Sequence, residues 1–232
     1  MNHISQTCRP DISFAVGRVA RYQTTPTPRV IDAAKRILRY LLSTKEEGLK
    51  YSKERESAFN AIFKKIATEG ERIDRYGKVV QFTDSDWAGC ASTLKSTSGS
   101  VHYMRGMPVV WISRRQPLRA GSSCEAELVG CHAGITVGRS QGWMDWLLDE
   151  ETKPHVIFTD SKSMIDLAKQ KYTSRKSKHI QLRYLSVRDE VDRLCYVNTK
   201  LNKADVLTKP TYTKDILNPH ETVEVNCAEI GL

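Results

Sequence analysis

Four acidic residues stand where their side chains can converge on one site. Asp84 and Asp160 each follow an apolar, strand-like run, Glu127 lies in the first turns of a long predicted helix, and Asp205 opens the last predicted helix. Strands of an α/β sheet direct side chains into a crevice at their carboxyl ends. Carboxylate oxygens are the ligands that Mg²⁺ prefers, and a pair of such ions can activate water beside a phosphodiester. The pattern is typical of a metal site that acts on phosphate esters.

Each of these acids also has a structural interpretation. A lone Asp after a strand is commonly a turn or N-cap residue, and Asp160 could cap the helix that follows it. Asp205 would favour the dipole of a helix that Asn202 caps. Asp86 is either an additional ligand or a turn residue. Glu127 differs, because it lies inside the apolar, small-residue run AELVGCHAG, where capping does not explain it.

The elements that must position these acids alternate between strands and helices. Arg105-Gly106 predicts a hairpin turn, and Ser122-x-x-Glu125 predicts a capping box at the start of the long helix. Three strands in a meander, followed by alternating helix and strand, predict an α/β fold with a mixed five-stranded sheet flanked by helices. We expect strands at 79–82, 100–104, 109–113, 155–159 and 195–198, and helices at 123–148, 161–170, 180–194 and from 202 onward.

A separate helical segment precedes this pattern. Ile31, Ala34, Ile37, Leu38 and Leu41 share one face of an amphipathic helix. The charged and weakly patterned stretch after it reads as a linker that contains at most a short helix. We therefore divide the chain into an N-terminal region at 1–52, a linker at 53–77, the main domain at 78–210 and a C-terminal tail at 211–232.

The composition favours a polyanionic partner. The 232 residues carry a formal net charge of +9, and the segment from Ser161 to Lys209 is especially rich in Lys and Arg. None of the 6 cysteines forms a CxxC pair, which argues against a structural zinc site and suits free thiols. The chain shows neither an apolar signal core nor a membrane-length apolar run. We expect an intracellular protein, cytoplasmic in a virus-like particle or nuclear, that is not secreted and has no membrane partner.

Five motifs point to a known family. They occur in order between Lys78 and Pro210: FTDSDWAGC with KSTSGSV, SSCEAEL, FTDSKSMIDLAK, SRKSKHIQLRYLSVRD and NKADVLTKP. Their order and spacing resemble the ribonuclease H domain of copia/Ty-type (Pseudoviridae) retrotransposon Pol polyproteins. The resemblance implies a ribonuclease H-like fold that binds two Mg²⁺ ions, with Mn²⁺ as a substitute. It assigns Asp84, Glu127, Asp160 and Asp205 as catalytic carboxylates and metal ligands.

The chain departs from the family pattern in a few places. Leu128 replaces the usual aromatic residue after the helix glutamate, and Ser161 replaces Asn after the third carboxylate. Cellular ribonucleases H often carry a histidine before the last Asp, but residues 200–203 contain none. The four acidic positions themselves are kept, so these departures leave the predicted metal ligands in place.

The first residues resemble a different part of the same polyprotein. RPDISFAVGRVARY and AAKRILRYLLSTKEEGLKY are similar to the C-terminal end of a copia-type reverse transcriptase. The chain contains no Y-x-D-D motif, so the polymerase site is absent. The resemblance implies a short helical remnant at the N-terminus and a partner in the missing reverse transcriptase portion.

Basic and hydroxyl-bearing residues are predicted to bind the nucleic acid. Lys and Arg neutralise phosphates, and Ser and Thr hydrogen-bond them. Trp87 and Trp111 are interpreted as packing residues rather than base-stacking platforms. Discrimination of RNA from DNA would depend on the 2′-hydroxyl. The predicted contacts are Lys95, Ser96, Thr97, Ser98, Arg175, Lys176, Lys178, His179 and Arg183.

Three functions are compatible with these observations. The leading hypothesis is an endoribonuclease that hydrolyses the RNA strand of RNA–DNA hybrids during reverse transcription. The first alternative is a catalytically inactive or domesticated remnant that still binds hybrids. The second is an integrase-type strand transferase, which the placement of Glu127 before the third carboxylate and the closing Asp205 disfavour.

Overall fold

The computed structural model describes residues 1–66, 79–139, 156–170 and 178–210. The helices are α1 (Asn2–Thr7), α2 (Ser13–Ala20), α3 (Pro28–Ser43), α4 (Lys53–Ile66), α5 (Ser123–Arg139), α7 (Lys162–Lys169) and α8 (Lys178–Arg188). The strands are β1 (Val79–Ser85), β2 (Thr97–Met104), β3 (Met107–Arg115), β4 (Val156–Thr159) and β5 (Leu194–Tyr196). Short 3-10 helices are η1 (Pro10–Ile12), η4 (Val191–Arg193), η5 (Thr199–Leu201) and η6 (Asp205–Leu207).

The five strands form one mixed sheet in the order β3-β2-β1-β4-β5. β1 pairs antiparallel with β2, and β2 pairs antiparallel with β3. β4 pairs parallel with β1 on one side and with β5 on the other. The expected α/β class, with a mixed five-stranded sheet flanked by helices, is confirmed. Since β1 and β4 are parallel neighbours, their carboxyl ends meet at one edge of the sheet.

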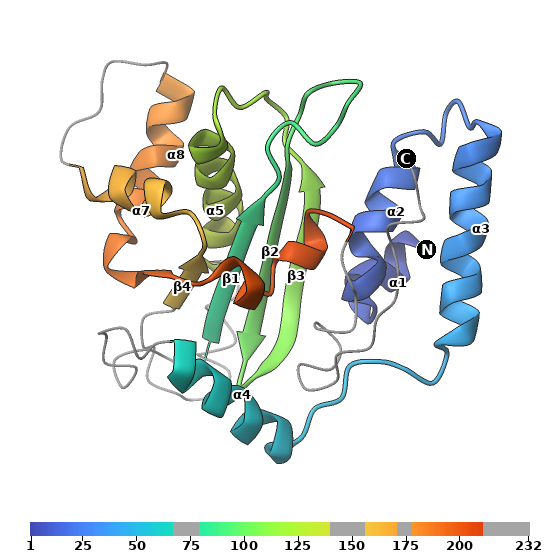
Figure 1. Ribbon diagram of the computed structural model, residues 1–232, viewed down its shortest axis with the longest axis horizontal. Coiled ribbons are helices and arrows are strands. Elements are labelled where there is room, and N and C mark those ends of the chain that lie inside the picture. The colour runs from blue at the N-terminus through green and yellow to red at the C-terminus, as the bar shows by residue number, and fades with distance from the viewer. Residues whose placement is uncertain (67–78, 140–155, 171–177, 211–232) are drawn as a thin grey trace.

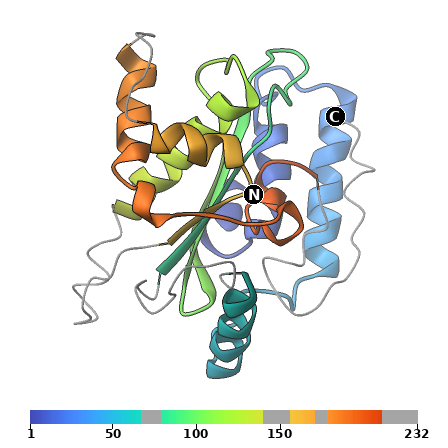
Figure 2. The ribbon, with the colours of Figure 1, turned by 60° about the vertical axis from the view of Figure 1, so that its left-hand side comes forward.

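Helices cover both faces of the sheet. α5, α7 and α8 lie on one face, and α1, α2 and α3 lie on the opposite side, with η6 in front of β1 and β2 (Figures 1 and 2). Side chains of alternating strand residues enter two apolar cores. One core contains Ile157 with residues of α5, α7 and α8, and the other contains Phe82, Phe158 and Leu207. Every residue of β1 is buried, which explains why its sequence does not alternate strictly.

α5 approaches β1 closely because one of its faces carries small residues. A Cβ atom at Gly130 would collide with the Ser85 hydroxyl, and one at Gly134 would collide with the Gln81 amide. The glycines therefore let the helix backbone pack against polar side chains of the central strand. This close approach brings Glu127, one turn before Gly130, to the carboxyl end of β1.

Polar contacts hold the N-terminal region together and tie it to the sheet. Arg9 donates to the Asp11 carboxylate at 2.7 Å and to the Thr44 hydroxyl at 2.7 Å, and all three side chains are buried. Trp111 of β3 donates its indole N–H to the Ser5 carbonyl at 2.6 Å. Buried pairs of this kind tie a segment firmly only when both partners are present. The first helices are therefore part of the folded unit around β3.

The expected amphipathic helix is present as α3, but its buried face differs from the predicted one. The buried residues are Val30, Ala33 and Ile37, whereas Ile31 and Leu38 are 44% and 48% exposed. Only Ile37 of the predicted face is buried. The buried face differs from the predicted one because it is set by Ile37, which packs with Ile12 and Val16, the buried residues of the preceding segment.

The start of the predicted linker is a packed helix. α4 spans Lys53–Ile66, and its Phe59 is 5% exposed. The Phe59 ring stacks on Tyr103 of β2 with 5.1 Å between the ring centroids. The sequence allowed at most a short helix in this stretch, whereas α4 takes up residues 53–66 and packs on the sheet through Phe59. Residues 67–77 of that linker lie outside the described residues.

Several predicted boundaries also shift. The helix expected at 180–194 ends at Arg188, because Leu194 instead pairs with Ile157 as the first residue of β5. The helix expected from residue 202 is the single turn η6. The predicted hairpin turn is confirmed, and Arg105 and Gly106 both have positive φ, at 49° and 78°. Residues 140–148 of the predicted long helix lie outside the described residues.

None of the helices in the described ranges combines the length and the apolar character that a bilayer crossing requires.

Candidate metal centre

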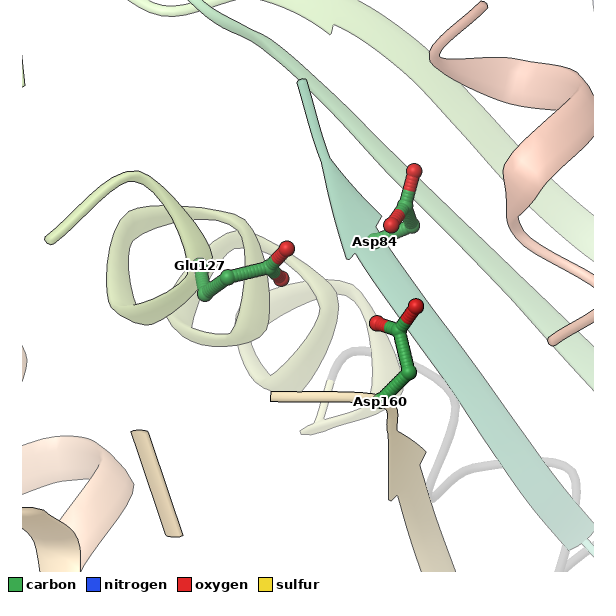
Figure 3. A group of neighbouring side chains, drawn as sticks. All are labelled: Asp84, Glu127 and Asp160. Carbon is green, nitrogen blue, oxygen red and sulfur yellow. The ribbon is translucent and has the colours of Figure 1, made fainter. Parts of the chain in front are cut away.

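Three of the predicted carboxylates meet at the carboxyl edge of the sheet. One oxygen from each of Asp84, Glu127 and Asp160 lies within 4.8 Å of the others. The three side chains come from β1, α5 and the residue after β4, and they point toward one another in Figure 3. An oxygen-only donor set of this size matches a divalent cation such as Mg²⁺. The sequence prediction that these three acids converge agrees with the structure.

The C-terminal segment packs against Asp84 because β2 offers a glycine opposite it. Asp84 is the register partner of Gly99, and a Cβ atom at Gly99 would lie 2.7 Å from the Thr208 methyl group. Without that Cβ, the chain after Asn202 lies directly over β2. The Thr208 hydroxyl donates to Asp84 Oδ2 and thereby fixes one oxygen of this carboxylate.

Asn202 links three parts of the site. Its side-chain amide donates to the Thr83 carbonyl at 3.0 Å and to Asp160 Oδ1 at 3.3 Å, while its Oδ1 accepts from the Ala204 amide at 3.2 Å. The side chain is 5% exposed. The sequence predicted Asn202 only as a helix cap. Its second role joins residues 119 positions apart, which no local motif indicates.

Asp160 is not the cap of the following helix. The N-cap of α7 is Ser161, whose hydroxyl accepts from the Met164 amide at 3.2 Å. The capping interpretation of Asp160 is therefore wrong. Because Ser161 takes that task, the Asp160 carboxylate stays available to the site.

Glu127 carries an unpartnered oxygen into the cluster. The side chain is 8% exposed, and its Oε2 is buried with no hydrogen-bond partner. A buried carboxylate oxygen without a partner is costly unless it is protonated or binds a cation. Burial, together with the charges of Asp84 and Asp160, raises the pKa of Glu127 to about 9. An orphaned oxygen in this position is what a metal ligand requires.

The pKa values of Asp84 and Asp205 are also raised. Burial raises the pKa of Asp84 to about 6, while the Thr208 hydroxyl opposes the shift and the Asp205 charge adds to it. Burial also raises the pKa of Asp205, and a hydrogen bond from Lys209 opposes that shift. Clusters of carboxylates with raised pKa values are common at functional sites.

Asp205 itself lies beside the group of three. It is the first residue of η6, and its Oδ1 lies 3.0 Å from Lys209 Nζ. Burial lowers the pKa of the Lys209 ammonium, but the charges of Asp84, Asp205 and Asp160 outweigh burial and raise it overall. Sequence reasoning missed both Thr208 and Lys209, although both belong to the motif NKADVLTKP.

The other acids considered from sequence have structural roles. Asp86 accepts from the Thr97 amide and so closes the start of β2 against the end of β1. Glu125 turns back to the chain as the capping box predicts: its amide bonds the Ser122 hydroxyl at 3.1 Å, and its Oε2 accepts from the Gly121 amide at 2.8 Å.

The predicted nucleic-acid contacts divide into two groups. Ser96, Thr97 and Ser98 are 0%, 1% and 3% exposed, and their hydroxyls bond other parts of the chain. Buried hydroxyls cannot reach a bound strand, so these three predictions were wrong. Lys95 lies beside them and donates to the Pro117 carbonyl at 2.5 Å, and Arg183 is half-buried on α8. Arg175 and Lys176, and the side chains of Lys178 and His179, lie outside the described part of the chain.

The two tryptophans also differ. Trp111 is 8% exposed and packs in the core, as expected. Trp87 is 55% exposed, so the packing interpretation was wrong for this residue. Its indole N–H donates to the Ala120 carbonyl at 3.2 Å, which fixes an exposed aromatic ring two residues after β1.

Comparisons with known proteins extend over most of the chain. No protein-family model matches it. The Pol polyprotein of transposon RE1 from Arabidopsis thaliana is 32% identical over 210 residues, which are 87% of this chain and 13% of the relative. The Pol polyprotein of transposon TNT 1-94 from Nicotiana tabacum is 32% identical over 208 residues, 87% of this chain and 14% of the relative. The Ty1-JR2 Gag-Pol polyprotein of Saccharomyces cerevisiae is 22% identical over 214 residues, 90% of this chain and 11% of the relative.

The sheet and the carboxylate cluster form a fold able to hold a divalent cation, and the relatives show which class of protein the chain resembles. Over most of its length the chain is similar to one stretch of the copia-type retrotransposon Pol polyproteins, as the five motifs indicated. It spans about an eighth of the length of the relatives it matches, 13% and 14% for the two plant polyproteins.

Solved structures give only a distant likeness. The N-terminal RNase H domain of a Mycobacterium tuberculosis protein has a TM-score of 0.43 and 16% identity, and covers 62% of this chain and 95% of its own. An RNase H1 solved in complex with an RNA/DNA hybrid has a TM-score of 0.41 and 15% identity, with 56% and 94% covered. Likenesses this remote carry no functional argument.

Proposed function

We propose that this chain is the ribonuclease H region of a copia-type polyprotein and hydrolyses the RNA strand of RNA–DNA hybrids. The observation that carries the proposal is the orphaned Glu127 Oε2, aimed at Asp84 and Asp160 within a 4.8 Å group of carboxylate oxygens. Similarity to retrotransposon Pol polyproteins supports it, because such elements replicate through an RNA–DNA intermediate. The proposed division of the chain keeps residues 78–210 as the nuclease domain.

The donor set fits a hard divalent cation, Mg²⁺ or Mn²⁺. Asp84, Glu127 and Asp160 would hold one ion, and Asp205 would contribute to a second. Bound ions would supply Lewis-acid chemistry, neutralising charge on the phosphodiester and lowering the pKa of water. The chain's own residues orient the ligands: Thr208 holds Asp84, and Asn202 holds Asp160.

We propose that the hybrid is held by the basic segment before α8 together with Lys95 and Arg183. Phosphate contacts give affinity and salt dependence without sequence preference. The double variant Arg175→Ala/Lys176→Ala should weaken hybrid binding evenly across sequences and lower the salt slope by about one for each phosphate that it no longer neutralises. An unchanged salt slope would show that the hybrid docks on another surface of the protein.

The test of the function is cleavage of a labelled RNA–DNA hybrid, with Mg²⁺ and with EDTA. We expect cutting of the RNA strand with Mg²⁺ alone, and loss of cutting in Asp160→Asn. Asp166→Asn, an exposed carboxylate on α7, is the matched control and should cut at the wild-type rate. Full activity of Asp160→Asn would refute the assignment. Hybrid binding without cutting by the wild type would favour the inactive-remnant alternative.

A further inference from the structure

Asp205 stands apart from the other carboxylates because a cation of this chain already pairs with it. The group whose oxygens lie within 4.8 Å of one another contains Asp84, Glu127 and Asp160. Asp205 Oδ1 instead lies 3.0 Å from the Lys209 ammonium. Within the described part of the chain, Asp205 forms an ion pair with Lys209, whereas the three grouped carboxylates form none.

The backbone holds this ion pair in place. The Lys209 amide donates to the Asp205 carbonyl at 3.2 Å, so the two residues lie on one helical turn. Between them, Thr208 is fixed to Asp84 through its hydroxyl, and its side chain is fully buried. The Asp205 side chain is 19% exposed and that of Lys209 is 41% exposed. The Lys209 side chain is therefore partly exposed to solvent, while its backbone is held by the hydrogen bond to the Asp205 carbonyl.

We propose that Lys209 acts as a tethered cation that holds Asp205 and excludes a second divalent ion from the substrate-free protein. The proposal rests on the proposed function only in treating Asp84, Glu127 and Asp160 as the first metal site. An ammonium is a compact charge, and a dication binding to the same carboxylate is repelled by it. The second ion can occupy Asp205 only after Lys209 has left it. Lys209 is thus a positioning residue that sets the metal stoichiometry.

The test is isothermal titration calorimetry of the full chain with Mn²⁺, without nucleic acid. The wild type should bind one ion. Lys209→Gln removes the charge but keeps most of the length and a donor, and should gain a second ion with affinity improved on the order of tenfold or more. Lys209→Arg keeps the charge and should stay at one ion. Lys200→Gln, at an exposed lysine of the same segment, is the matched control and should match the wild type.

A further variant locates the second ion. Asp205→Asn in the Lys209→Gln background should return the protein to one ion. The proposal is overturned if the wild type takes up two ions of similar affinity, if Lys209→Gln keeps the wild-type stoichiometry, or if no ion binds at all. Failure of the proposed function would give a different result. One ion in the wild type and two in Lys209→Gln, with no cutting of hybrids, would support this inference and contradict the proposed nuclease activity.

Discussion

Replacing Asp84 by Asn should stabilise the metal-free protein at alkaline pH. Asp84 is 4% exposed, and burial raises its pKa from 3.8 to about 6. The folded state therefore holds the proton more tightly than the unfolded chain does. Below about pH 4 the carboxyl is protonated in both states and costs nothing. Between pH 4 and 6 the unfolded carboxyl ionises while the folded one keeps its proton, so the free energy of unfolding falls, and above pH 6 the loss is complete.

A pKa raised from 3.8 to about 6 lowers the free energy of unfolding by about 3 kcal/mol above pH 6. Asn keeps a side-chain oxygen that can accept from the Thr208 hydroxyl, so the substitution removes the charge without removing the hydrogen bond. It also removes one of the charges that raise the pKa of Glu127. For a chain of this size, a gain of about 3 kcal/mol raises Tm by roughly 6–12 °C.

The assay is urea unfolding followed by circular dichroism, in EDTA at pH 4 and pH 8, with Asp166→Asn as control. Asp84→Asn should exceed the wild type in stability at pH 8 and approach it at pH 4, and Asp166→Asn should match the wild type at both. In Mg²⁺ the order should reverse, because only the wild type gains stability from the bound ion. An Asp84→Asn protein that is less stable than the wild type at pH 8 in EDTA would refute the electrostatic argument.

Three further substitutions test the packing that builds the site. Asn202→Ala should lower the free energy of unfolding in urea by about 1–3 kcal/mol, because the buried Thr83 carbonyl of β1 and the half-buried Asp160 carboxylate lose their donor. Gly130→Ala should lower Tm by pushing α5 away from β1, and Ser85→Ala in the same chain should restore part of the stability, whereas no rescue would place the clash elsewhere. Phe59→Ala should lower the free energy of unfolding by about 3–5 kcal/mol, because the Phe59 ring is buried against Tyr103. A change within error would show that α4 does not belong to the core.

The order of strands and helices could be predicted because each leaves a local pattern. Local patterns of a few residues each predict the strand that carries Asp84, the hairpin at Arg105-Gly106 and the capping box at Glu125. The same local reasoning failed where a distant contact decides. In α4 the apolar residues Phe59, Ile62, Phe63 and Ile66 recur at helical spacing, but the charged residues around them hid this signal, and the packing of Phe59 against Tyr103 joins distant parts of the chain. The buried face of α3 likewise depends on Ile12 and Val16, which no pattern inside the helix specifies.

Residue type and position made the carboxylates candidates and the five motifs singled them out, but their supporting contacts were not predictable. Ser96, Thr97 and Ser98 looked like phosphate ligands because their side chains are polar, yet the sheet buries them. Polarity gives no information on burial when hydrogen bonds inside the protein satisfy the hydroxyls. Gly99, in the same motif, has the decisive role, since its missing side chain admits the C-terminal segment.

The last described segment completes the site, and it does so through contacts of long sequence separation. Thr208 reaches Asp84 over 124 positions, and Asn202 reaches the Thr83 carbonyl over 119. The carboxylates of β1 and β4 already meet through strand pairing, but their orientation depends on this returning segment. Because Asn202, Thr208 and Lys209 all lie in NKADVLTKP, that motif combines ligand, orienting and charge-balancing residues in one short stretch. Strand pairing therefore brings the carboxylates together, and residues 202–209, packed over Gly99, orient them and balance their charge.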